Sequence, residues 1–195
     1  ITMKVFVFAL LIFTSSTSIA QANNKINWMT WNEMTALRET DSVKKKIFVD
    51  FYTGWCGWCK KMDATTFADP NIVAYMNQNF YAVKFDAETR DTIVFNNHTF
   101  VNTDPTFIKT SPNARGRTHW FAQSLLESQL SYPSYAMLDE NFTRLMIWKG
   151  FKKQDELIGI LVFFATNQYK YYHNFLNEQW QNSLKKQQDK IKSGQ

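Results

Sequence analysis

The chain has 195 residues, which is enough for one ordinary domain and too few for two domains with full cores. Hydrophobic residues make up 45% and charged residues 20% of the sequence, a balance that excludes a disordered tail. The formal net charge is +5, and only two cysteines are present, so this is not a scaffold held together by several disulfides.

The first twenty residues have the pattern of a secretory signal peptide. Lys4 precedes an apolar run over 5–13, and the small-x-small triplet Ser18-Ile19-Ala20 follows. We therefore expect cleavage after about residue 20 and a periplasmic or secreted protein, with no lipobox cysteine. A membrane anchor is the alternative, although the apolar run is much shorter than the roughly 20 residues that a spanning helix needs. No later segment is long enough for stable membrane insertion.

Strands and helices are predicted to alternate along the first half of the remaining chain. Apolar spacing predicts a helix over 28–43, and a β-branched and aromatic run predicts a buried strand over 47–52. A helix is expected over 56–67, and Asp69-Pro70 then indicates the start of another. A strand over 80–85 follows.

The second half continues this alternation. A hairpin over 92–101 is predicted to turn at Asn96-Asn97, with a loop over 102–116 and a helix over 118–129 behind it. The remaining expected elements are strands at 134–138 and 144–149, a helix at 154–167, and a helical, basic extension at 169–195 packed through Tyr171, Phe175 and Trp180. The order predicts an α/β fold with a central mixed sheet flanked by helices.

The two cysteines form a Cys-x-x-Cys motif where a strand gives way to a helix. Cys56 would lie at the helix N terminus, where free N–H groups and the helix dipole favour a thiolate, and Cys59 would lie one turn further on the same side. This arrangement predicts thiol–disulfide exchange. The alternative is a stapling disulfide, which would contribute only about 2 kcal/mol for so short a loop. His98, His119 and His173 are isolated in the sequence, so no metal site is expected.

The segment 49–62, Val-Asp-Phe-Tyr-Thr-Gly-Trp-Cys-Gly-Trp-Cys-Lys-Lys-Met, resembles the active-site segment of thioredoxin-like proteins. It is most similar to the exported bacterial thiol–disulfide oxidoreductases, which keep an aromatic residue before the first cysteine. The resemblance covers about 26–166 and includes Tyr132-Pro133-Ser134 as the cis-proline loop, Lys84 and Gly150. It implies a thioredoxin-like domain over 26–168, interrupted by an insertion at about 90–116.

The resemblance also implies roles for single residues. Asp50 would be a buried carboxylate with a raised pKa that takes the proton from Cys59, and Lys84 would adjust that carboxylate. The alternatives are a backbone-bonded Asp50 at a strand end and a Lys84 that points to solvent. Residues expected to contact substrate surround the cysteines: Trp55, Gly57, Trp58, Tyr132, Pro133 and Gly150.

Two features depart from the common reducing thioredoxins. Gly57-Trp58 stands where those proteins have Gly-Pro, and this dipeptide is one control on reduction potential. The insertion is expected to lie beside the active site, where it either selects partners or is a surface decoration. Its aromatic and basic residues are Phe95, Phe100, Phe107, Arg115 and Arg117.

The predicted function is an exported thiol–disulfide oxidoreductase that acts on protein thiols and disulfides as a reductase. Its only redox group would be the Cys56–Cys59 disulfide, with no further cofactor and no metal. A membrane thiol electron donor is the partner that reduction in an oxidising compartment implies. The alternative is a thioredoxin-fold adaptor or chaperone with an inert disulfide. Nucleic-acid binding is not expected, because the lysines of 185–192 are interleaved with Gln and Asp189.

Overall fold

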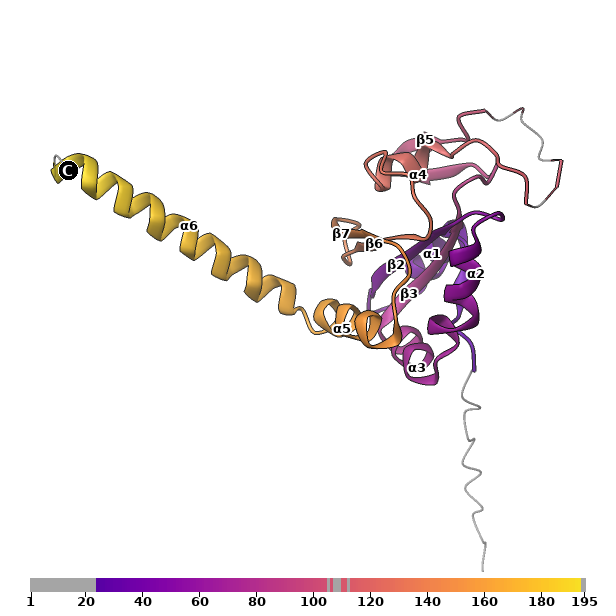
Figure 1. The fold of residues 1–195 in the computed structure, drawn as a ribbon, viewed down its shortest axis with the longest axis horizontal. Helices are drawn as coiled ribbons and strands as arrows, with labels where there is room; N and C mark the ends of the chain where they lie inside the picture. Colours follow the sequence, from indigo (N-terminus) through magenta and orange to yellow (C-terminus); the bar gives the residue numbers. More distant parts are fainter. Residues whose placement is uncertain (1–23, 105, 107–109, 112, 194–195) are drawn as a thin grey trace, which may run out of the picture.

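The computed structural model describes residues 24–104, 106, 110–111 and 113–193, so the predicted signal segment over 1–20 lies outside the described residues (Figure 1). The strands are β1 Trp28–Met29, β2 Lys46–Tyr52, β3 Phe80–Asp86, β4 Ile93–Phe95, β5 His98–Phe100, β6 Ser134–Leu138 and β7 Arg144–Lys149. The helices are α1 Trp31–Thr40, α2 Gly57–Ala64, a 3₁₀ turn Thr66–Ala68, α3 Pro70–Asn79, α4 Trp120–Leu125, α5 Gln154–Ala165 and α6 Gln168–Ser193.

Five of the strands form one mixed sheet in the order β1-β3-β2-β6-β7. The pairs β1–β3 and β2–β3 are parallel, whereas β6 is antiparallel to both β2 and β7. The central strand β2 is almost wholly buried, as expected for a strand covered on both faces. This confirms the predicted mixed sheet flanked by helices, which is a thioredoxin-like architecture.

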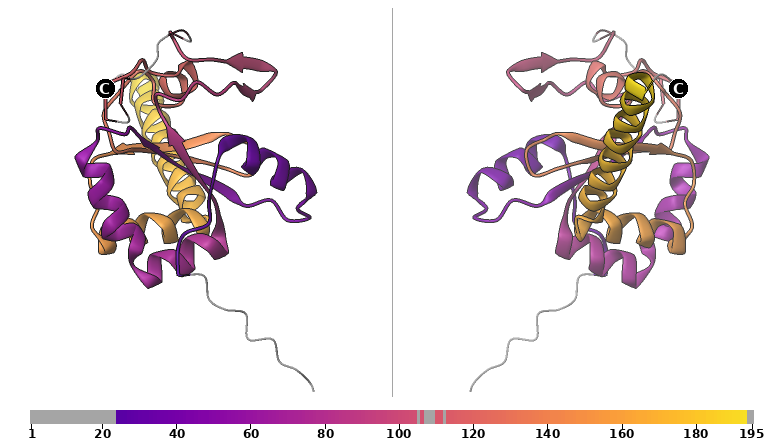
Figure 2. Two further views of the ribbon diagram at one scale, coloured as in Figure 1. Left: turned by 90° about the vertical axis from the view of Figure 1, so that its right-hand side faces the viewer. Right: turned by 90° about the vertical axis from the view of Figure 1, so that its left-hand side faces the viewer.

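Alternation along β2 divides the interior into two cores. Ile47, Val49 and Phe51 belong to the core that also contains residues of α1 and α4. Phe48 points to the other core, which is formed with α2, α3 and α5. Figure 2 shows the β4–β5 hairpin and α4 on one side of the sheet and α3 and α5 on the other. Residue 50 has the parity of Phe48, so its side chain is on the α2 side.

The N-terminal helix begins later than the sequence spacing predicts. Trp28 and Met29 form an edge strand that pairs with Ala82 and Val83 of β3, and α1 begins only at Trp31. Thr30 caps this helix: its hydroxyl accepts the Glu33 N–H, and the Glu33 carboxylate accepts the Thr30 N–H at 2.7 Å. The prediction of a helix from residue 28 is therefore wrong, because a capping box and a strand pairing outweigh the apolar spacing.

The other boundaries differ less. The helix expected over 56–67 ends at Ala64 and continues as a separate 3₁₀ turn, and the helix expected over 118–129 is shortened to α4. The predicted hairpin turn is confirmed, since Asn96 and Asn97 have φ angles of 49° and 61°, as a two-residue type I′ turn requires. Both C-terminal strands have their predicted bounds.

The C-terminal helix α6 extends away from the rest of the molecule (Figure 1). Its helical nature is confirmed, but the expectation that aromatic side chains pack it is wrong. Tyr171, Phe175 and Trp180 are 75%, 53% and 63% exposed. The spacing of these aromatic residues correctly indicates a helix. It does not indicate whether another part of the protein packs against them. Among the described helices, none combines the length and the apolar content needed to cross a bilayer.

Candidate active site

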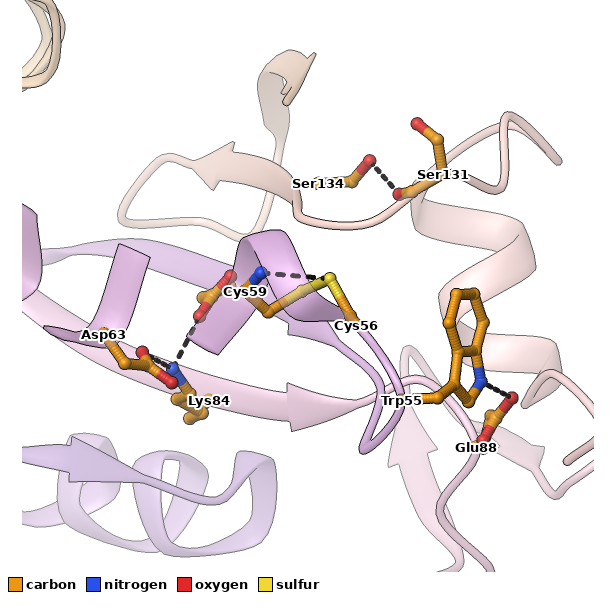
Figure 3. The surroundings of a disulfide bond; sticks show 9 residues. Trp55, Cys56, Cys59, Asp63, Lys84, Glu88, Ser131 and Ser134 are labelled. Carbon is orange, nitrogen blue, oxygen red and sulfur yellow. Dashed lines mark hydrogen bonds and ion pairs between the residues drawn. A yellow bond between two sulfur atoms is a disulfide. The ribbon is translucent and has the colours of Figure 1, made fainter. Parts of the chain in front are cut away.

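The two cysteines lie where the sheet leads into α2. After β2 ends at Tyr52, the Cys56 N–H bonds the Thr53 carbonyl at 3.1 Å, and Cys56 becomes the N-cap of α2. The Cys56 Sγ accepts the Cys59 N–H at 3.0 Å and forms a disulfide with the Cys59 Sγ (Figure 3). After reduction, the same N–H and the helix dipole would stabilise a thiolate on Cys56.

Asp50 is a buried carboxyl in the middle of the central strand. It is 1% exposed, and its neighbours in register are Lys84 on β3 and Tyr135 on β6. The Lys84 Nζ lies 3.0 Å from the Asp50 Oδ2, whereas the Oδ1 has no hydrogen-bond partner among the described residues. Burial raises the pKa of Asp50 to about 6, and the attraction of Lys84 offsets this only in part. The two side chains thus lie together in the arrangement that the family resemblance implies.

A second carboxylate of the site, Asp63, was not predicted from the sequence. It lies on α2 and forms an ion pair with the same Lys84 ammonium (Figure 3). Lys84 therefore bridges Asp50 and Asp63. Burial lowers the pKa of Lys84, but the two carboxylates outweigh that effect and hold it above its usual value. Asp63 follows Cys59 by four residues, and this helical spacing is the signal that could have identified it.

The residues expected to contact substrate come from three segments. Tyr132-Pro133 is a cis peptide before β6, and the Pro133 carbonyl accepts the Gly150 N–H at 2.8 Å. Gly150 has a φ of 82°, in the left-handed region that favours glycine. The rings of Trp55 and Tyr132 meet edge to face, with their centroids 6.0 Å apart. The structure therefore joins the segments before α2, before β6 and after β7.

The two tryptophans of the motif differ in exposure. Trp58 is 57% exposed, and Gly57 beside it has no other atom within 4 Å of where a Cβ would lie. Trp55 is half-buried, and its Nε1 donates to the Glu88 Oε1 at 2.9 Å (Figure 3). The expected apolar surface beside the cysteines is therefore formed mainly by Trp58.

The insertion contacts the active-site segment through polar residues. The Arg115 guanidinium lies 4.6 Å from the centroid of the Trp55 ring, and the Lys60 Nζ donates to the Asn113 Oδ1 at 3.1 Å. Phe95 and Phe100 are half-buried, and both pack against Phe121 of the core. Whether these rings select partners stays a prediction. Arg117 is exposed, and Phe107 lies outside the described residues.

The three histidines do not form a metal site. His119 is buried; its Nδ1 accepts the Phe121 N–H at 3.0 Å, and its Nε2 lies 2.8 Å from the Asp91 carbonyl. His98 lies in β5 and His173 in α6, far apart in the chain. In the part of the chain that the structure describes, no three His, Cys, Asp or Glu side chains are grouped to hold a metal ion.

The fold and the site together define a class of protein: a thioredoxin-like domain with a Cys-x-x-Cys disulfide at the N terminus of the helix after the central strand. The family model Thioredox_DsbH, described as "Protein of unknown function, DUF255", matches residues 9–108. The match spans just over half of the chain, and the chain belongs to this family.

Curated relatives match the chain over shorter stretches. The Uncharacterized protein B0495.5 of Caenorhabditis elegans is 31% identical over 75 residues, which are 38% of this chain and 10% of that protein. The thiol:disulfide interchange protein DsbD of Photorhabdus laumondii is 31% identical over 62 residues, which are 31% of this chain and 11% of that protein. The chain thus spans about a tenth of the length of these relatives.

Solved structures match at low identity. A DsbH oxidoreductase is 17% identical, covering 74% of this chain and 86% of its own, with a TM-score of 0.47. A thioredoxin from Thermus thermophilus is 14% identical, covering 70% of this chain and 85% of its own, with a TM-score of 0.49.

Proposed function

We propose that this protein is a thiol–disulfide oxidoreductase that exchanges disulfides with protein substrates, and that it acts as a reductase. One observation carries the proposal: the Cys56–Cys59 disulfide caps α2, on the side of the sheet to which the buried Asp50 carboxyl points. A stapling disulfide does not require a buried carboxyl whose pKa stays raised despite a neighbouring ammonium. The relation to a protein named thiol:disulfide interchange protein supports the same reaction class.

The reductive cycle begins with both cysteines reduced. The Cys56 thiolate attacks one sulfur of a substrate disulfide, so a Cys56–substrate bond forms and the other substrate sulfur leaves as a thiolate that takes up a proton. Cys59 then loses its proton and attacks the Cys56 Sγ, which releases the second substrate sulfur. The substrate disulfide gains two electrons, and the Cys56–Cys59 disulfide is left as the oxidised product.

Asp50 is proposed to take the proton from Cys59. The Cys59 residue is 3% exposed, so its thiol has little access to water as a proton acceptor. With a pKa of about 6, Asp50 is mostly ionised at neutral pH and is still basic enough to accept a proton. Lys84 and Asp63 would adjust that basicity from the far side of the carboxylate.

Export of the protein, and a membrane thiol donor that returns it to the dithiol form, are part of the proposal. Export is supported by the charged, apolar and small-x-small order of residues 4–20. A reductase in an oxidising compartment needs electrons from outside that compartment, because the surroundings drive its cysteines to the disulfide.

Paired cysteine variants test the activity. Cys56→Ser should abolish insulin reduction, whereas Cys59→Ser should accumulate a covalent adduct with the substrate because the resolving thiol is missing. The Cys56→Ser protein is the matched control, since it should form no adduct. Full activity of Cys56→Ser would overturn the proposed mechanism.

The reduction potential of the cysteine pair tests the direction of electron flow. Reducing members of the fold lie near about −270 mV and oxidising members near about −120 mV. A value toward the lower end supports a reductase, and a value toward the upper end contradicts it. Absence of any reversible couple would contradict the oxidoreductase proposal and favour the adaptor alternative.

A further inference from the structure

Five cationic side chains belong to, or contact, the Cys-x-x-Cys segment and the turn at Gly150, and we call them the basic rim: Lys60, Lys61, Arg115, Lys149 and Lys152. The first two directly follow Cys59, and Arg115 comes from the insertion. The last two flank Gly150, whose N–H donates to the Pro133 carbonyl. All but the half-buried Lys152 are exposed.

The two rim lysines of α2, Lys60 and Lys61, each contact neutral groups. The Lys61 Nζ lies 4.9 Å from the centroid of the Trp58 ring and 5.1 Å from that of Phe151, so it bridges the motif and the segment after β7. The Lys60 Nζ donates to the amide oxygen of Asn113 at 3.1 Å. These contacts fix the positions of the charges without neutralising them.

The same holds for the other three cations. Arg115 is over the Trp55 ring, and the Lys149 Nζ donates to the Gln129 Oε1 at 3.1 Å. The Lys152 Nζ donates to the Lys149 carbonyl at 3.1 Å, and its backbone N–H contacts the Met62 sulfur of α2 at 3.3 Å. Within the described part of the chain, no member of the rim has an ion pair.

The neighbouring acids are already engaged in other contacts. Glu88 is 6% exposed, and its carboxylate accepts the Trp55 Nε1–H. Asp63 is the ion-pair partner of Lys84. Outside the rim, Lys46 and Arg144 are each paired with a glutamate, whereas Lys44 and Lys45 donate to carbonyl oxygens. The rim therefore presents a net positive charge at the place where a substrate must approach the sulfurs.

We propose that the basic rim makes this protein selective for polypeptides in which the reacting cysteine is flanked by aspartate or glutamate. The inference rests on the proposed exchange activity and adds the substrate class. Opposite charges raise the local concentration of substrate at the site and accelerate encounter, by about ten- to a thousandfold in steered associations. The members of the rim come from α2, the insertion and the turn at Gly150, so we expect the rim to contact acidic residues on either side of the substrate cysteine.

Three disulfide-containing peptides of equal length test the proposal, with Asp, Ser or Lys on both sides of each cysteine. Wild-type protein in the dithiol form is mixed with each peptide, and the second-order rate constant of exchange is measured at about 20 mM and about 500 mM salt. We expect the Asp peptide to react at least about tenfold faster than the Lys peptide at low salt. The ratio should approach one at high salt, where the screening length is roughly 4 Å.

A charge-reversed rim provides the variant arm. Lys61→Glu/Arg115→Glu should lower the Asp-to-Lys rate ratio to near one, because three cations then stand against two carboxylates in the rim. The matched control is Lys185→Glu/Lys186→Glu, which changes the net charge equally on α6, and it should keep the wild-type ratio. The ratio is the readout because a change in Cys56 reactivity alters both rates alike.

The outcomes separate the two proposals. Exchange with all three peptides at equal rates would overturn the substrate selectivity and leave the oxidoreductase activity standing. An equal loss of selectivity in the α6 control would also overturn the role of the rim, since the net charge of the protein would then explain the preference. Failure of the Ser peptide together with the other two would overturn the oxidoreductase proposal and the selectivity with it.

Discussion

Replacing Asp50 by asparagine keeps the shape of the side chain and removes a carboxyl that burial has made hard to ionise. Burial raises the pKa of this carboxyl to about 6 from its ordinary value of 3.8. A raised carboxyl pKa means that the folded state binds the proton more tightly than the unfolded state does. Its contribution to stability is therefore complete below pH 3.8 and is lost as the pH rises through about 6. Above that range, ionised Asp50 destabilises the fold.

The size of the effect follows from the two pKa values. Their difference corresponds to about 3 kcal/mol of unfolding free energy at pH 8, where both states are ionised. At pH 4 the penalty is only about 0.5 kcal/mol, and most of the change occurs between about pH 4 and 6. Relative to wild type, Asp50→Asn should therefore gain about 2.5 kcal/mol of stability on going from pH 4 to pH 8. Lys84 keeps its ion pair with Asp63 in the variant, so no unpaired buried cation is created.

Guanidinium unfolding of the oxidised proteins, followed by tryptophan fluorescence at several pH values, measures this difference directly. Glu39→Gln, at an exposed site, controls for the loss of one negative charge. The test uses the way in which the difference in unfolding free energy between wild type and Asp50→Asn changes with pH. The absolute size of that difference is not used. Parallel free-energy curves for wild type and Asp50→Asn from pH 4 to 8 would refute the claim that Asp50 is a desolvated carboxyl.

Three further predictions concern the site and the fold. Lys84→Met should raise the pKa of Asp50 further and move the pH profile of mixed-disulfide resolution to higher pH. Asp63→Asn should lower the pKa of Asp50 and move the profile to lower pH. Shifts of the two profiles in the same direction would contradict the bridging geometry. Trp31→Ala should cost about 3–5 kcal/mol in denaturant unfolding, because the ring is 1% exposed and packs against other aromatic rings, and a loss below 1 kcal/mol would contradict that packing. Gly150→Ala should cost about 1 kcal/mol, since a Cβ there meets no atom but the φ of 82° disfavours alanine; an unchanged unfolding midpoint would show that this backbone relaxes.

Much of the site could be predicted because its signals are local. The Cys-x-x-Cys spacing, the strand before it and the resemblance together indicated Cys56, Cys59 and Asp50, and the structure brings Lys84 to Asp50. Their catalytic roles stay predictions. Asp63 was missed because its importance comes from an ion pair with a strand that is 21 residues away in the sequence.

The failures of the sequence analysis are failures to predict long-range pairing. Trp28 fits a helical spacing, yet it becomes part of a strand because residues of β3, more than fifty positions later, offer it a parallel partner. Phe95 was assigned to a surface insertion, and the structure packs one side of its ring against Trp31 and Phe121. Periodicity reports which side chains share a face, but it does not report what that face meets.

The extended C-terminal helix determines how the molecule behaves hydrodynamically. At a rise of about 1.5 Å per residue, the 26 residues of α6 are about 39 Å long. A compact chain of 195 residues would have a radius of gyration of about 16 Å. A helix of that length projecting from one side raises the radius of gyration and makes tumbling anisotropic. In gel filtration the protein should therefore elute ahead of compact globular standards of its 23.0 kDa mass.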